Sequence, residues 1–444
     1  MIKHYVLTAL VLLSGAASVT ALANSVENSH RSQVAGIDLI TYHTDVKDVV
    51  VILGSLPAGD AMAESGDIAI PTLAGMMLDR GTKTLDKFAI AEQLDNVGAE
   101  IAFTVGTQTL EIRAKCLKKD VPLVIGLIAA ELRTPALQAQ EFAKAKQQFI
   151  GALEASAQNT EARAQEAFGR AIFPQGHPNR PHTVSEYEAA AKAATLDELK
   201  AFHAKYYGPA HLTLVVVGDV AAPETQGEIE KAFSGWSGGQ DYVRPAAPAV
   251  MTAAREVSVP LADKPSVSVI LGQPTGLRYK DPDALALRVG TAVLGSGFTG
   301  RLMGSVRDKE GLTYGISAAV AEDSVVDGSW DISASFAPAL LEKGIASTRR
   351  ELVKWWTDGV TDQELTARKQ GLVGGYLVGL STTGGLANAI LTDIQRGYDV
   401  SRVDTFPDAV NALTRDQVNS AIKKHLDPSR MVLVEAGSVA PAPH

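Results

Sequence analysis

Residues 195–220, TLDELKAFHAKYYGPAHLTLVVVGDV, are repeated at residues 414–439 as TRDQVNSAIKKHLDPSRMVLVEAGSV. The two stretches align without a gap, and Thr, Asp, Lys, Pro, Leu, Val, Gly and Val recur in register. Each stretch predicts a capped helix, a turn that contains proline and a strand that ends at glycine. A repeat of this kind indicates that the chain holds two homologous halves.

The sequence upstream of each copy supports the same duplication. LDNVGAEI around Gly98 corresponds to RDKEGLTY around Gly311, with an aspartate at the same distance before each glycine. Residues 234–250 are rich in Gly, Ala and Pro, which is typical of an interdomain linker. We therefore expect domains at residues 24–233 and 251–444. Each mixes runs of strands with runs of helices, which favours two α+β sandwich domains with mixed or antiparallel sheets over a doubly wound parallel sheet.

Composition and charge exclude several classes of protein. The chain has 444 residues, of which 46% are hydrophobic, and is long enough for two or more well-packed domains. Its net charge of −9 leaves no basic surplus to neutralise phosphates, so a nucleic-acid partner is not expected. The single cysteine, Cys116, cannot form an intramolecular disulfide or a multi-cysteine zinc site. It lies in the alternating run 109–117 and is predicted to be a buried strand residue.

The first residues predict a secretory signal peptide. Lys3 and His4 form a short basic region, residues 5–13 are apolar, and Ala21-Leu22-Ala23 fits the cleavage pattern. We expect cleavage near Ala23, which places the mature protein in the periplasm or otherwise outside the cytoplasm. No later run of about eighteen apolar residues predicts a membrane span.

Residues 298–320, FTGRLMGSVRDKEGLTYGISAAV, predict an amphipathic helix, a left-handed cap at Gly311 and a strand. Arg307 and Tyr314 lie on either side of this turn, so both side chains could point at one place. Taken alone, the pattern favours a solvated charge at a helix end and a half-buried strand aromatic.

These features resemble the pitrilysin- and insulinase-type zinc peptidases, which include mitochondrial processing peptidase and the core subunits of the bc1 complex. The resemblance covers nearly all of the expected mature chain and rests on LDRGT, GHPNRP, LVVVGDV and GRLMGSVRDKEGLTYGI. The last motif is similar to the family's arginine/tyrosine motif, on which Arg307 and Tyr314 match. The resemblance implies two similar α+β domains per chain and pairs of chains that close like a clam around a peptide-sized chamber.

The sequence departs from this family at the metal site. Active members carry HxxEH, in which two histidines bind zinc and the glutamate deprotonates its bound water. The corresponding positions here are Thr72, Gly75 and Met76, none of which can replace those groups. The third family ligand, a glutamate on a long helix, would fall near Glu154. We therefore expect this chain to bind no zinc and to be inactive alone.

Other candidate sites in the sequence are weaker. His177, His182, His203, His211 and His425 show no ligand spacing with an accompanying acid, so structural or surface roles are favoured. GWSGG at residues 235–239 matches GxSxG but lacks the strand and helix of a nucleophile elbow. GLSTTGGLA at residues 379–387 lacks the lysine of a phosphate loop and fits a turn between helices.

The resemblance implies a division of labour between two chains. A partner subunit with HxxEH would hold the zinc, and Arg307 and Tyr314 of this chain would bind the substrate carbonyl or its oxyanion. Unfolded peptides would be the substrates, and a homodimer is possible without the partner. Two alternatives stay open, namely a structural or assembly subunit without chemistry and a protein that captures peptides without cleaving them. The role of Arg301, close to the pair in sequence, also stays open.

Overall fold

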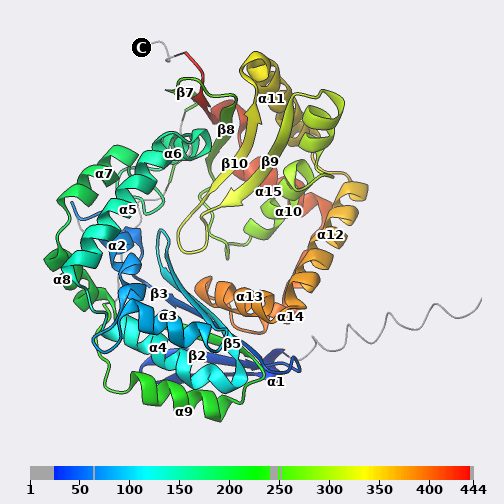
Figure 1. Cartoon of the computed structure of the whole chain (residues 1–444). Helices are drawn as coiled ribbons and strands as arrows, with labels where there is room; N and C mark the ends of the chain where they lie inside the picture. Colours follow the sequence, from blue (N-terminus) through cyan, green and yellow to red (C-terminus); the bar gives the residue numbers. More distant parts are fainter. Residues whose placement is uncertain (1–24, 64–65, 241–248, 251–252, 441–444) are drawn as a thin grey trace, which may run out of the picture.

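The computed structural model describes residues 25–63, 66–240, 249–250 and 253–440. The predicted signal peptide and residues 241–248 of the predicted linker lie outside these ranges. Figure 1 shows two lobes that face each other, each built on one β-sheet. Among the described residues, no helix is both long enough and apolar enough to cross a bilayer.

The first half of the chain builds a six-stranded sheet in the order β1-β2-β6-β3-β5-β4. Only β2 and β6 are parallel; the other neighbouring pairs are antiparallel. The strands are β1 (Ser29–Val34), β2 (Ile37–His43), β3 (Val49–Leu56), β4 (Glu100–Val105), β5 (Leu110–Leu117) and β6 (Thr213–Gly218). The helices of this half are α1 (Ser25–Asn28), α2 (Ile70–Met76), α3 (Lys87–Asp95), α4 (Val121–Arg133), α5 (Ala139–Ala157), α6 (Thr160–Ile172), α7 (Val184–Ala193), α8 (Leu196–Tyr206) and α9 (Ala222–Phe233).

The second half builds a five-stranded sheet in the order β7-β11-β8-β10-β9, with β7 and β11 parallel. Its strands are β7 (Arg255–Pro260), β8 (Val267–Pro274), β9 (Thr313–Ala321), β10 (Ser329–Phe336) and β11 (Val432–Gly437). Its helices are α10 (Ala284–Gly295), a π-helix (Met303–Lys309), α11 (Leu341–Asp358), α12 (Asp362–Leu380), α13 (Thr383–Gln395), α14 (Arg402–Ala412) and α15 (Arg415–His425).

The two halves share one plan, as the repeat predicts. The strand order of the second sheet reproduces that of the first without β1. Helices α5 and α12 both have 19 residues, α6 and α13 both have 13, and α8 and α15 both have 11. Gly98 and Gly311, paired by the sequence alignment, adopt φ values of 63° and 64°, which favour glycine. The predicted α+β fold with two helix-packed sheets is confirmed.

One helix of each half packs against the sheet of the other half. Helix α6 packs Phe168 and Ile172 against Ile270 of β8 and Val434 of β11. Helix α13 packs apolar side chains such as Ile390 against the inner face of β2, β3 and β6. The outer face of each sheet is covered by helices of its own half. Two hydrophobic clusters therefore join the lobes, and this exchange was not predicted from the sequence.

Two helices differ from the sequence prediction. The long helix that carries Glu154 ends before Asn159, whose side chain accepts a hydrogen bond from the Ala162 amide and caps α6. The helix before Gly311 contains a π-helical stretch. Cys116 is buried in β5, as predicted.

Candidate functional site

The site begins where the π-helix gives way to edge strand β9. Arg307 lies in the last turn of this helix, Gly311 makes the left-handed turn, and Tyr314 is the second residue of β9. π-Helices are rare and frequently occur at functional sites. The Tyr314 side chain is 89% exposed, so it is not a half-buried strand aromatic. The turn brings Arg307 and Tyr314 together.

Aromatic rings flank the Arg307 guanidinium. Its Cζ atom lies 5.2 Å from the ring centroid of Tyr314 and 5.2 Å from that of Phe298. The nearest carboxylate oxygen, on the exposed Asp308, is 4.0 Å from Nε. The guanidinium forms no hydrogen bond with another described residue, so its N–H groups are available to a ligand.

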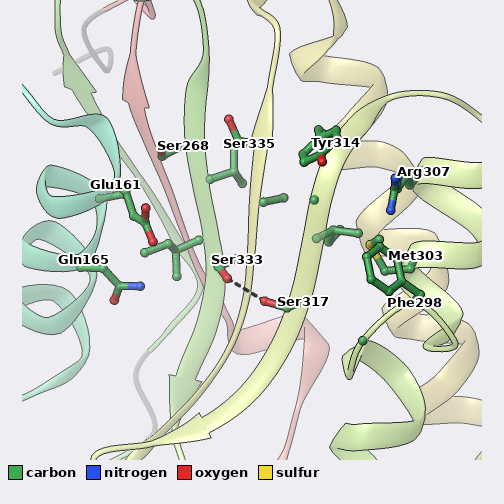
Figure 2. Close-up of a pocket in the computed structure, with 17 residues that line it drawn as sticks. Glu161, Gln165, Ser268, Phe298, Met303, Arg307, Tyr314, Ser317, Ser333 and Ser335 are labelled. Carbon is green, nitrogen blue, oxygen red and sulfur yellow. Dashed lines mark hydrogen bonds between the residues drawn. The ribbon is translucent and has the colours of Figure 1, made fainter.

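A pocket of about 430 Å³ lies beside this pair. Figure 2 shows Arg307, Tyr314 and Phe298 on one side, and Glu161 and Gln165 of α6 on the other. Hydroxyl groups of the second sheet lie between these walls, and the Oγ atoms of Ser317 and Ser333 are 3.2 Å apart. The pocket is lined by Glu161, Ala164, Gln165, Ser268, Val269, Ile270, Gly297, Phe298, Met303, Arg307, Tyr314, Gly315, Ile316, Ser317, Ser333, Ala334 and Ser335.

The chemistry of this pocket suits a peptide backbone. Arg307 offers several N–H donors and Tyr314 one hydroxyl donor, and both can bind a carbonyl oxygen or an oxyanion. Strand β9 is the edge of its sheet, so its outer backbone groups can pair with an extended chain. The serine hydroxyls both donate and accept hydrogen bonds and place no charge on the floor of the pocket.

The residues at the family's zinc position are packed and cannot hold a metal. Thr72 donates a hydrogen bond of 2.9 Å to Asp60, and a Cβ atom at Gly75 would lie 2.3 Å from a methyl carbon of Val105. Burial raises the pKa of Asp60 to about 6, although Thr72 and Tyr187 both donate to it. Val105 therefore fills the space that the HxxEH glutamate would need.

Acidic side chains elsewhere do not restore a metal site at this position. Glu154, the expected third ligand, is exposed on α5. In the described parts of the chain, no group of three or more His, Cys, Asp or Glu side chains could hold a metal ion. Thr72, Gly75, Met76 and Glu154 do not line the pocket of Arg307 and Tyr314. The residues present do not fit zinc.

Arg301 belongs to a structural ion pair outside the pocket. Its Nε and Nη2 atoms donate to the two carboxylate oxygens of Glu364 at 2.6 and 2.7 Å, and Nη2 also donates to the Gly359 carbonyl. The Arg301 hydrogen bond is the main cause that lowers the pKa of Glu364 to about 2. Arg301 therefore ties the segment before the π-helix to the start of α12.

Several histidines serve local contacts. His203 lies 2.8 Å from the Leu132 carbonyl, and His425 lies 2.9 Å from the Asp283 carboxylate. His177 is buried against Phe173, and its Nε2 is 3.1 Å from Asp327 of the second half. The neighbouring Asn179 of GHPNRP donates to the carbonyls of Glu322 and Asp327. This loop joins the halves.

Comparison with known proteins shows which family part of the chain resembles. Residues 193–372 match the family described as the peptidase M16 inactive domain. An uncharacterised zinc protease of Streptomyces coelicolor is 27% identical over 354 residues, which are 77% of this chain and 76% of that protein. The non-peptidase homologue YmxG of Helicobacter pylori is 22% identical over 376 residues, or 83% and 84% of the two chains.

Solved structures share the fold of this chain. The peptidase M16 inactive domain of Pseudomonas fluorescens superposes with a TM-score of 0.84 at 22% identity, and the match covers 93% of this chain and 98% of that one. The periplasmic protease PqqL of Escherichia coli has a TM-score of 0.75 at 15% identity, and the match covers 93% of this chain and 46% of that one. The pitrilysin-type resemblance drawn from the sequence is confirmed at the level of the M16 family.

Proposed function

We propose that this M16 chain is the substrate-binding, non-zinc subunit of a heterodimeric zinc peptidase outside the cytoplasm. A partner subunit with HxxEH supplies the zinc and the general base, and this chain supplies Arg307 and Tyr314. The observation that carries the proposal is the guanidinium of Arg307, which is flanked by rings and donates no hydrogen bond to another described residue. It lies beside a pocket, and the described residues of this chain offer no metal site.

In this proposal Arg307 and Tyr314 act on the carbonyl that is attacked. Their donors stabilise the oxygen as it gains negative charge, and removal of such a donor costs on the order of 100- to 1000-fold in turnover. If they act on the ground state alone, their loss raises KM and leaves kcat unchanged. An extended peptide at the β9 edge is held by backbone hydrogen bonds, so many sequences are accepted.

The extracytoplasmic location is part of the same proposal. It rests on the expected signal peptide, and the structural neighbour PqqL is described as periplasmic. The test compares the location of the full chain with that of a chain without the expected signal peptide after overexpression. The full chain in the periplasmic fraction and the shortened chain in the cytoplasmic fraction would support the proposal. Equal cytoplasmic retention of both chains would contradict it.

The test is a set of kinetic measurements on a mixture of this chain with the HxxEH subunit. Arg307→Ala and Tyr314→Phe should each lower kcat, and Arg301→Ala, which changes a side chain outside the pocket, should not. A mixture whose kcat and KM are indifferent to both pocket variants would contradict the proposal.

Peptide capture without cleavage is the second candidate, favoured by the relative described as a non-peptidase homologue. It predicts that the chain alone binds unfolded peptides at the Arg307 pocket and that no HxxEH subunit associates with it. Co-purification of such a subunit with the tagged chain at a constant ratio would exclude this candidate.

A further inference from the structure

Phe298 is a pocket residue that the arginine/tyrosine motif did not single out. With exposed fractions of 78% and 89%, Phe298 and Tyr314 are the two most exposed large hydrophobic side chains among the described residues. Exposed apolar side chains that lie together often mark an interaction site, whereas single exposed apolar side chains are common and need no explanation. Both rings also share one neighbour, the guanidinium of Arg307.

The position of Phe298 is set by the backbone. Helix α10 ends at Gly295, and Gly297 has a φ of 62°, which turns the chain just before Phe298. The ring centroid then lies 5.2 Å from Cζ of Arg307, within the roughly 6 Å at which a cation is attracted to a ring face. This contact comes from the segment before the π-helix, whereas Tyr314 comes from the strand after it.

Few other interactions hold Arg307. The contact with Asp308 is 4.0 Å long and involves an exposed carboxylate, and such pairs contribute little. Arginine has many rotamers, and a guanidinium that is free to sample them binds a ligand less well. Rings on a guanidinium leave its N–H groups, which lie in the guanidinium plane, available to an oxygen ligand.

We propose that Phe298 is a positioning residue, which acts through its ring to hold the Arg307 guanidinium so that its N–H groups face the pocket. This inference rests on the proposed function, in which these N–H groups bind the peptide oxygen. It assigns to Phe298 no chemical step of its own. Its effect depends on the ring face, so tyrosine and tryptophan replace it and leucine, although apolar, does not.

The test is peptide binding by the full chain, with a fluorescein-labelled casein peptide selected for binding to the unmodified protein. Phe298→Leu should weaken binding by about 3- to 30-fold, the range that corresponds to a cation–π contact, and Phe298→Tyr and Phe298→Trp should restore it. In an Arg307→Ala background, Phe298→Leu should have no further effect, because the ring then has no guanidinium to hold.

The matched control is Phe88→Leu. Phe88 is 74% exposed on α3, carries Lys87 Nζ at 5.3 Å from its ring and does not line the pocket. It should leave binding unchanged, and thermal unfolding checks that each variant is folded. Equal losses from Phe298→Leu in both backgrounds would mean that Phe298 contacts the peptide itself, and would overturn the inference. The proposed function would also be overturned if Arg307→Ala left peptide binding unchanged, or if no peptide bound to the unmodified protein.

Discussion

At the scale of single residues, the metal position shows how a catalytic site is lost through packing. Gly75 lies where the family has its general base, and Val105 of β4 occupies the space beyond it. Exchange of the three motif residues alone therefore does not recreate the zinc site, because the glutamate has no room.

This leads to a prediction for the variant Thr72→His/Gly75→Glu/Met76→His. It should bind no stoichiometric zinc after dialysis and should lose about 1–3 kcal/mol of stability, as expected for an overpacked core. Metal analysis and chemical unfolding measure both quantities. Addition of Val105→Ala should recover part of the stability. One zinc per chain with unchanged stability in the triple variant would contradict this description of the position.

Glu131 should make the stability of the fold depend on pH. Its side chain is 1% exposed on α4, and Oε2 has no hydrogen-bond partner among the described residues. Burial, and next the charge of Asp79, raise the pKa of Glu131 to about 8. A carboxyl with a raised folded pKa holds its proton more tightly in the folded state. Its contribution to stability is therefore full below the unfolded pKa of about 4.5 and is lost as the pH rises through about 8.

Glu131→Gln should remove this dependence. Relative to the unmodified chain, the variant should gain on the order of a few kcal/mol between about pH 5 and pH 9, because one pKa unit corresponds to about 1.4 kcal/mol. Urea unfolding at both pH values measures the gain. A stability difference between the two proteins that is the same at pH 5 and pH 9 would show that Glu131 is not a buried neutral acid.

At the scale of elements, the ion pair of Arg301 and Glu364 fixes the π-helix segment against α12. Because the pKa of Glu364 is lowered to about 2, the pair stabilises the fold above the unfolded pKa of about 4.5 and loses this effect as the pH falls toward 2. Arg301→Ala should cost about 1.5–3 kcal/mol near neutral pH, as for hydrogen bonds to charged groups.

Two measurements check the role of Arg301. The stability difference between Arg301→Ala and the unmodified chain should shrink as the pH falls from about 7 to about 3. Peptide affinity should stay unchanged, in contrast to Arg307→Ala. A large loss of affinity with little loss of stability would instead make Arg301 a ligand contact.

The sequence predicted many elements but not their irregularities. The capped helices at residues 196–206 and 415–425 follow from Thr195 and Thr414, whose capping boxes are both formed. The break between α5 and α6 at Asn159 was not predicted, because the capping role of this residue depends on the turn of the chain. The sequence did not single out Phe298 as a pocket residue, because the arginine/tyrosine motif is recognised by its charged and hydroxyl groups. Its one sequence signal is the glycine before it.

At the scale of the whole molecule, the exchange of α6 and α13 makes the lobes depend on each other. Phe168 and Ile172 of the first half lie in a cluster with strands of the second half, and α13 closes the opposite cluster. Periodicity shows that a helix has an apolar face but not which sheet that face will cover. This long-range choice is the part of the fold that the sequence could not predict.

The exchange predicts that both halves unfold together. Phe168→Ala should cost about 3–5 kcal/mol, because it empties a buried contact between α6 and the second sheet. Calorimetry should show one transition for the unmodified chain, and the variant should shift it as a whole. Two resolved transitions, with only one moved by Phe168→Ala, would show that the lobes are thermodynamically independent.

The central claim is that this chain completes an active site whose zinc belongs to another subunit. The most direct measurement compares hydrolysis of an unfolded casein peptide by this chain alone, by the HxxEH subunit alone and by their mixture. We predict hydrolysis by the mixture alone, lost with a chelator and reduced by Arg307→Ala and Tyr314→Phe. Chelator-resistant hydrolysis by this chain alone, or a mixture no more active than the HxxEH subunit, would contradict the claim.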